Sequence, residues 1–127
     1  MLLVETYIDR SAIQGIGLFA RRFIARGAVV WELRPAYDRL IAVEQWESET
    51  GTVKDYLDRY AYPSRAHPGF ILFEADDARY MNHADEPNCD VSDEQLHVAL
   101  RDIQPDEELT CDYGAFFPGG FEMLGDR

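Results

Sequence analysis

Residues 78–89 read ARYMNHADEPNC, a short polar segment with Asn82 and His83 at its centre and Pro87 near its end. An amide and an imidazole side by side can donate and accept several hydrogen bonds within one loop. Pro87 fixes its own φ and favours an extended residue before it, so the exit of the loop is rigid. Asn, Asp and Pro are also common turn residues, and on this window alone a surface turn is the simpler interpretation.

Two further segments change that interpretation, namely GIGLFA at 15–20 and EELTCDYG at 107–114. The three segments contain Gly15-Ile16-Gly17, then Arg79-Tyr80-Met81-Asn82-His83-Ala84-Asp85-Glu86-Pro87-Asn88, then Glu108-Leu109-Thr110-Cys111-Asp112-Tyr113. In this order they resemble the three motifs of the SET family of S-adenosylmethionine-dependent lysine methyltransferases. The resemblance covers roughly residue 4 to residue 117. A Gly-x-Gly alone is weak evidence, whereas the third motif at the family's usual distance is specific.

The composition is that of one ordinary globular domain. The chain has 127 residues, 46% hydrophobic and 13% aromatic, which is enough to bury a core without disulfides or a metal. No apolar run approaches a membrane span, and the N-terminal MLLVETYIDR lacks the basic start of a signal peptide. Two cysteines indicate no disulfide framework, which favours a reducing, cytoplasmic location.

The charge balance limits the partners. Asp and Glu number 24 against 12 Lys and Arg, giving a formal net charge of −12. A field of that sign repels nucleic acid and attracts basic proteins or peptides, so we expect no direct nucleic acid partner. Solubility alone would also explain an acidic protein. The sequence leaves the oligomeric state unknown, with a homodimer as open as a monomer.

The pattern along the chain predicts a mostly β, α+β fold. The pattern predicts strands in 2–10 and 69–75, two short strands in 18–33 separated by a turn at Arg26-Gly27, and a strand in 95–103, where Leu96, Val98 and Leu100 share one face. Between them, helical spacing of apolar residues predicts a helical insert over about 38–60. We expect a single SET-like domain over 1–127. The resemblance further implies small curled sheets and a C-terminal segment that threads beneath a loop in a knot-like crossing.

The resemblance also implies where S-adenosyl-L-methionine binds. Gly15, Ile16 and Gly17 would meet the methionine part of the cofactor through backbone groups, because glycines allow close approach. The Asn82 side chain would bind the cofactor's amino group, the His83 backbone would meet adenine, and Arg79 would flank the pocket. A simple turn and a packed histidine are the structural alternatives. Ala84 and Asp85 replace the Ser and Cys that the family often has there.

Tyr113 is the predicted catalytic residue, again by resemblance. Methyl transfer from a sulfonium to an amine is an in-line displacement, so the protein must align donor and acceptor. A phenol hydroxyl and convergent carbonyls can hold the methyl group through weak C–H···O contacts. A tyrosine is a poor general base with an ordinary pKa near 10, so we expect Tyr113 to orient the amine. A core aromatic is the structural alternative.

Aromatic residues around the motifs are weaker candidates. Tyr62 and Phe117 are the predicted partners of adenine and lysine, and Tyr60, Phe70 and Phe116 are alternatives that core packing explains equally well. Cys111 would lie in the lysine pocket, where relatives carry a bulky residue. The tail after 115, FFPGGFEMLGDR, lacks the cysteine-rich segment that many relatives use to bind zinc. The spacing of the cysteines and histidines matches no familiar zinc site, so we expect no metal.

The sequence therefore predicts a stand-alone protein lysine N-methyltransferase, of the short bacterial-like type, that acts on a basic protein segment. A non-catalytic module that keeps the SET fold and recognises a basic peptide is the alternative. Retention of the Gly-x-Gly, Asn82 and Tyr113 together favours the enzyme.

Overall fold

Short strands dominate the structure, a computed structural model that describes residues 1–116. The strands are β1 (Thr6–Arg10), β2 (Ile16–Ala20), β3 (Val29–Glu32), β4 (Arg39–Ala42), β5 (Tyr62–Pro63), β6 (Phe70–Phe73), β7 (Asn82–His83), β8 (Cys89–Asp90), β9 (Leu96–Ala99) and β10 (Glu108–Cys111). The helices are α1 (Val43–Glu47), α2 (Gly51–Tyr60) and the 3-10 turns η1 (Asp77–Tyr80) and η2 (Tyr113–Ala115).

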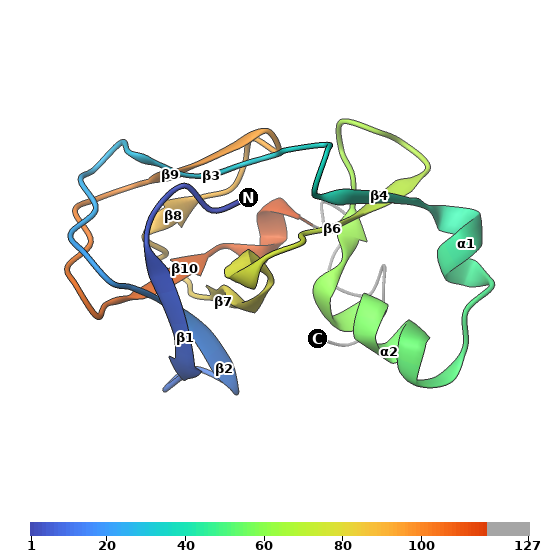
Figure 1. Cartoon of the computed structure of the whole chain (residues 1–127), viewed down its shortest axis with the longest axis horizontal. Coiled ribbons are helices and arrows are strands. Elements are labelled where there is room, and N and C mark those ends of the chain that lie inside the picture. Colours follow the sequence, from blue (N-terminus) through green and yellow to red (C-terminus); the bar gives the residue numbers. More distant parts are fainter. Residues whose placement is uncertain (117–127) are drawn as a thin grey trace.

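The strands form three small sheets. Their orders are β1-β2-β10-β7, β3-β9-β8 and β4-β6-β5. In Figure 1 the β1–β2 hairpin extends from one side of the molecule, while β4, β6 and both α-helices lie on the other side. In the first sheet β10 pairs antiparallel with β2 and parallel with β7, so segments from both ends of the chain meet there.

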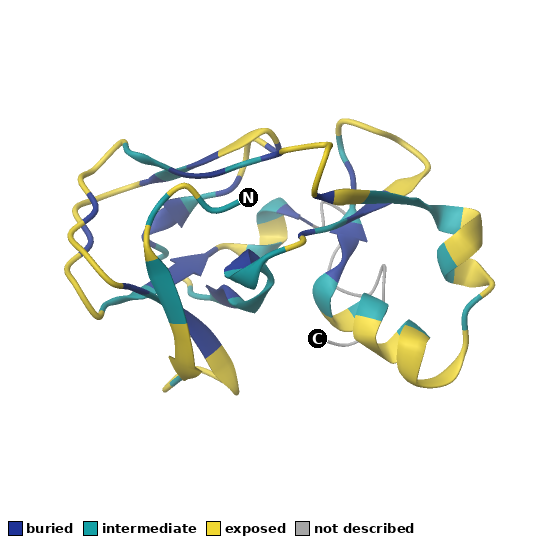
Figure 2. Ribbon diagram, viewed as in Figure 1, coloured by how far each residue is buried: buried dark blue, intermediate teal, exposed yellow. Residues whose placement is uncertain are grey.

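The core lies where these sheets face one another. Leu18 of β2 pairs directly with Leu109 of β10, and both side chains are fully buried. Trp31, Ile71 and Leu72 are buried as completely. Burial of each such side chain stabilises the fold by about 1.5–3 kcal/mol. Figure 2 shows the buried residues concentrated in the central strands and the exposed ones on α1, α2 and the hairpin tip.

The mostly β, α+β fold class is confirmed, but the predicted helical insert begins too early. Arg39–Ala42 is strand β4, paired with β6 through Leu40↔Leu72, and helix starts only at Val43. The spacing of Leu40, Val43 and Trp46 suggested a helix. The pairing with β6, which local spacing cannot reveal, holds the first of them in a strand.

Strand β9 does not follow a simple amphipathic pattern, in which its leucine side chains would face the core. The side chains of His97 and Ala99 are buried, whereas Leu96 and Leu100 are exposed. The inward face therefore carries a histidine, and the leucines lie on the outer one. The predicted knot-like threading is not tested by these strand pairings and stays a prediction. No helix within residues 1–116 has the length and apolar character needed to cross a membrane.

Candidate active site

The three sequence motifs lie in adjacent strands of one sheet. Glu108 and Leu109 of β10 pair with Phe19 and Leu18 of β2, which follow the Gly-x-Gly loop. Thr110 and Cys111, the next residues of β10, pair with Asn82 and His83 of β7. Segments far apart in the chain are thus brought side by side, and the turn η2 places Tyr113 directly after them.

The Asn82 side chain fastens the Gly-x-Gly loop to the sheet. Its Nδ2 donates to the carbonyl oxygens of Gln14 (3.1 Å) and Ile16 (3.2 Å) and to Oε2 of Glu108 (3.0 Å). All three partners accept only, so they fix which end of the amide faces the loop. Among residues 1–116, no side chain or backbone N–H donates to Asn82 Oδ1, which leaves that oxygen as an acceptor for a ligand.

Glu108 also holds the Gly-x-Gly loop against the sheet. It was not predicted as a site residue from the sequence. Its carboxylate accepts from the Ser11 hydroxyl at 2.8 and 2.9 Å as well as from Asn82. A Cβ at position 17 would lie 2.4 Å from Glu108 Oε2, so Gly17 must be glycine for the carboxylate to fit. Gly15 has a φ of +50°, a conformation that side chains disfavour. The only sequence signal for Glu108 was its place in the third motif.

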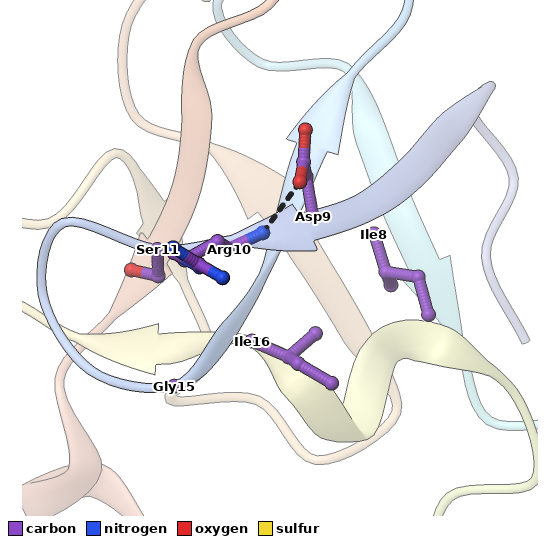
Figure 3. A pocket seen from close by; sticks show the side chains of 6 residues that line it. All are labelled: Ile8, Asp9, Arg10, Ser11, Gly15 and Ile16. Atoms are coloured by element: carbon purple, nitrogen blue, oxygen red, sulfur yellow. Dashed lines mark hydrogen bonds between the residues drawn. The ribbon is translucent and has the colours of Figure 1, made fainter.

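An open groove borders the same loop. It is lined by Ile8, Asp9, Arg10, Ser11, Gly15 and Ile16, and its volume is about 710 Å³. Figure 3 shows Ile8 and Ile16 as neighbours on the β1–β2 hairpin, with Ser11 and Gly15 at the two ends of the connecting loop. A groove of this volume is within the range that cofactor-sized ligands occupy.

Tyr113 and His83 hold the third motif against the second. The Tyr113 hydroxyl donates to the Met81 carbonyl oxygen at 2.8 Å, and the Tyr113 backbone N–H donates to His83 Nδ1 at 3.1 Å. His83 Nε2 lies 3.1 Å from Asp85 Oδ1. Because Nδ1 accepts, Nε2 carries the proton and donates to that carboxylate. The imidazole therefore braces the loop, while the Tyr113 hydroxyl and the Met81 carbonyl oxygen lie together.

A small cavity of about 20 Å³ lies beside Tyr113. That is about the room for one water molecule. Most of its lining is apolar or aromatic, as a lysine channel requires, and the predicted residues Tyr62, Arg79 and Cys111 contribute to it. The lining residues are Tyr60, Tyr62, Glu74, Ala78, Arg79, Met81, Val91, His97, Cys111, Tyr113 and Phe116. The predicted Phe117 lies outside the described residues.

Three ionisable side chains in this lining have strongly shifted pKa values, and burial is the main cause in each: the pKa of Tyr62 is raised well above its usual value, and Glu74 and His97 are shifted as well. Burial raises the pKa of Glu74 from 4.5 to about 7, although the hydrogen bond from Tyr62 (2.7 Å) opposes the shift. Burial also lowers the pKa of His97 from 6.5 to about 3. The His97 ring stacks on Trp31 with centroids 4.5 Å apart, and its Nε2 has no hydrogen-bond partner within residues 1–116. The sequence motifs predict neither Glu74 nor His97 as part of this cavity, and His97 is considered only as a ligand of a metal site that its spacing argues against.

Two aromatic rings and one cation complete the lining. Tyr62 stacks on Phe116 with centroids 4.2 Å apart, so Phe116, an alternative at the sequence level, is the aromatic residue that packs on Tyr62. The Arg79 guanidinium lies over the rings of Phe73 and Tyr80, at 5.7 and 5.1 Å from the centroids. Cys111 is buried and is not in a disulfide bond.

Comparison with known proteins gives the context of this site. Residues 15–114 match the family profile described as SET domain. The chain is similar to histone-lysine N-methyltransferase trithorax of Drosophila virilis, 36% identical over 135 residues and 87% of this chain. It is also similar to human histone-lysine N-methyltransferase 2D, 29% identical over 119 residues and 86% of this chain. The chain spans only 3% and 2% of these two relatives.

A solved structure shows the same fold. The crystal structure of a Plasmodium falciparum protein assigned to the histone methyltransferases superposes with a TM-score of 0.65 at 21% sequence identity. The match covers 89% of this chain and 96% of that one. At this identity the likeness supports the fold alone.

Proposed function

Since this chain belongs to the SET domain family, we propose that it is an S-adenosyl-L-methionine-dependent protein lysine N-methyltransferase. The observation that carries the proposal is the pairing of the Tyr113 hydroxyl with the Met81 carbonyl oxygen, 2.8 Å apart at a narrow, largely apolar cavity. Hydroxyl and carbonyl oxygens at one point can orient an amine and attract the hydrogens of a methyl group.

The residues around the Gly-x-Gly loop fit the cofactor that the family uses. Asn82 Oδ1 is an acceptor held in place by the bonds that Nδ2 makes to the carbonyl oxygens of Gln14 and Ile16, which suits an α-ammonium group. The groove beside Gly15 and Ile16 has the volume for a nucleoside-sized ligand. When bound, S-adenosylmethionine would supply the activated methyl group. The protein's own residues would hold the polar end of the cofactor and exclude water from the site of methyl transfer.

The surface beside Tyr113 supports a basic substrate. Asp85, Glu86 and Asp112 are exposed around His83, whose ring nitrogens lie 3.1 Å from Asp85 and 3.7 Å from Asp112. With the formal net charge of −12, these carboxylates would attract a lysine in a basic segment. We also propose a reducing, cytoplasmic location, supported by Cys89 and Cys111, which stay out of disulfide bonds.

Two substitutions test the proposal. Tyr113→Phe removes one hydroxyl, and we expect methyl transfer to fall by about 10²–10³-fold with unchanged cofactor affinity, as when one preorganised polar contact is lost. Asn82→Ala should weaken cofactor binding in a calorimetric titration. Tyr7→Phe is the matched control, because among the described residues the Tyr7 hydroxyl on the β1–β2 hairpin bonds only the exposed Asp106, in the turn before β10. Cofactor binding without methyl transfer to any protein would indicate the non-catalytic binding module instead.

A further inference from the structure

Glu74 is the only carboxylic acid among the described residues that line the cavity beside Tyr113. It follows strand β6 directly, and only 4% of its surface is exposed. One carboxyl oxygen, Oε1, accepts from the Tyr62 hydroxyl at 2.7 Å. Within residues 1–116 no group donates a hydrogen bond to the other oxygen, Oε2. A charged carboxyl in so buried a residue normally has a cation as its partner.

The groups around Glu74 do not supply that partner. Asp38 and Asp76 are acids that repel its charge, and the N-terminal ammonium that attracts it is bonded to Asp38 and the Glu32 carbonyl oxygen instead. Arg79 also lines the cavity, but its guanidinium lies over the rings of Phe73 and Tyr80 and donates to the Ala75 carbonyl oxygen.

On the strands β5, β9 and β10, the titratable groups that line the cavity are Tyr62, His97 and Cys111. Burial holds His97 in its neutral form at neutral pH, because its pKa is lowered to about 3. None of these three side chains brings a positive charge to Glu74. The cavity lining thus contains one carboxyl group, to which no cation among the described residues is bonded.

We propose that Glu74 is the group that removes the proton from the substrate lysine, a role that rests on the proposed methyltransferase function. An ammonium group is close to a water molecule in size, so it suits a cavity with room for one water. The Glu74 carboxylate accepts one proton from the lysine ammonium, which leaves a neutral amine and a neutral carboxylic acid. The amine beside Tyr113 then attacks the cofactor's methyl carbon, the C–S bond breaks, and its electron pair stays on sulfur.

The balance of the whole cycle requires that proton to leave. The methylated lysine departs as an ammonium, so each turnover produces one proton, which Glu74 releases to water when the products dissociate. A catalytic acid–base group works best when its pKa lies near the operating pH. The burial that raises the pKa of Glu74 to about 7 meets that condition. An ordinary lysine, with a pKa of about 10.4, needs such an acceptor together with a dry channel.

A purely structural role for Glu74 is the competing explanation. In that case the carboxyl would serve only to hold Tyr62, which stacks on Phe116. Two variants separate the roles. Glu74→Gln keeps an acceptor oxygen for the Tyr62 hydroxyl but cannot take a proton from an ammonium. Tyr62→Phe removes the hydrogen bond and leaves the carboxyl in place.

The kinetic test measures methyl transfer to core histones between pH 6 and about pH 10, the range that reaches the ordinary pKa of lysine. Glu74→Gln should lower kcat by about 10²–10⁴-fold near pH 7, and the deficit should shrink as the pH rises. Tyr62→Phe keeps the carboxyl and should cause a smaller loss, with the activity profile displaced to higher pH, because the hydrogen bond that holds the pKa of Glu74 down is gone. Equal losses in the two variants, or a Glu74→Gln deficit that is the same at every pH, would overturn the proposal.

An infrared titration of the protein tests the same role without any turnover. The wild type should show a carboxyl C=O band that titrates near pH 7, which Glu74→Gln lacks. Adding n-butylammonium, a mimic of the lysine end, should shift that titration to lower pH, because a bound cation stabilises the carboxylate. A band unaffected by n-butylammonium would refute the role of Glu74. Failure of methyl transfer alone, with the shift present, would refute the proposed methyltransferase function.

Discussion

Replacing Gly17 with alanine should both loosen the cofactor loop and destabilise the fold. The added Cβ would lie 2.4 Å from Oε2 and 2.8 Å from Cδ of Glu108, and 3.0 Å from the Ser11 Cβ. The carboxylate must therefore move, and its bonds from Ser11 and Asn82 break or lengthen. Hydrogen bonds to a charged group contribute about 1.5–3 kcal/mol each, less where water replaces them. We expect a net loss of about 1–3 kcal/mol.

Thermal unfolding measures this loss. For a domain of this size, each 1 kcal/mol corresponds to a shift in Tm of about 4 °C, so the variant should melt about 4–12 °C lower. Gly114→Ala is the matched control, because its added Cβ meets nothing closer than 3.1 Å, the distance to an Asp112 carboxyl oxygen. We expect the control to lie within about 1 kcal/mol of the wild type.

A double-mutant cycle identifies the cause. In a Glu108→Ala background the main clash is gone, so Gly17→Ala should cost less than about 1 kcal/mol there. The same pair should couple in calorimetric cofactor binding, since Glu108 and Asn82 together hold the loop. An identical cost of Gly17→Ala in both backgrounds would show that the close approach to Glu108 does not govern this loop.

Three further predictions concern pH, product and salt. Because burial lowers the pKa of His97 to about 3, its contribution to stability is complete above pH 6.5 and is lost as the pH falls toward 3. Urea unfolding measures the difference in the free energy of unfolding between wild type and His97→Phe. As the pH falls from 6.5 toward 3, this difference should shrink by up to about 1.4 kcal/mol per pH unit. A difference that stays constant would argue against a buried neutral His97. Cys111 is smaller than the bulky residue that relatives carry there and is a weak hydrogen-bonding group, so the wild type should add more than one methyl group and Cys111→Tyr should favour one. Mass spectrometry of the product decides this, and a wild type that stops at one methyl group would contradict it. KM for a basic peptide should rise with ionic strength through screening of the acidic surface, and a KM that salt does not change would contradict it.

The sequence predicted those parts of the site that are written in contiguous motifs. Asn82, His83 and Tyr113 lie together in the structure because β7 and β10 are adjacent, parallel strands. The Gly-x-Gly loop meets them through bonds from Asn82. When motif residues occur in the order and spacing of a known family, the resemblance itself predicts which distant strands pair. The local sequence pattern alone would not predict that pairing.

The residues that the sequence did not reveal are those placed by packing between distant segments. Ser11 bonds Glu108 across 97 positions of the chain, and Ser64 bonds Glu94 across 30. Glu74 looked like the polar end of an apolar strand, FILFE, and nothing local indicates that it is buried against Tyr62. The helix prediction fails at β4 for the same reason. Its partner strand β6 lies about 30 residues further along the chain, where Arg39 pairs with Phe73.

One labelling measurement tests the proposed transfer of a methyl group from the cofactor to lysine. The chain has a single lysine, Lys54, whose Nζ lies 4.4 Å from the centre of the Trp46 ring. Lys54→Arg keeps a cation over that ring and yields an enzyme without lysine, so every labelled lysine belongs to the substrate.

That lysine-free enzyme is incubated with core histones, a mixed lysate of basic proteins and methyl-deuterated S-adenosylmethionine, and the proteins are then analysed by tandem mass spectrometry. We expect deuterated methyl groups on lysine Nε atoms in basic segments, and their loss when Tyr113→Phe is added. The absence of deuterated methyl-lysine from all these proteins, or equal labelling with Tyr113→Phe, would contradict lysine methyl transfer at Tyr113.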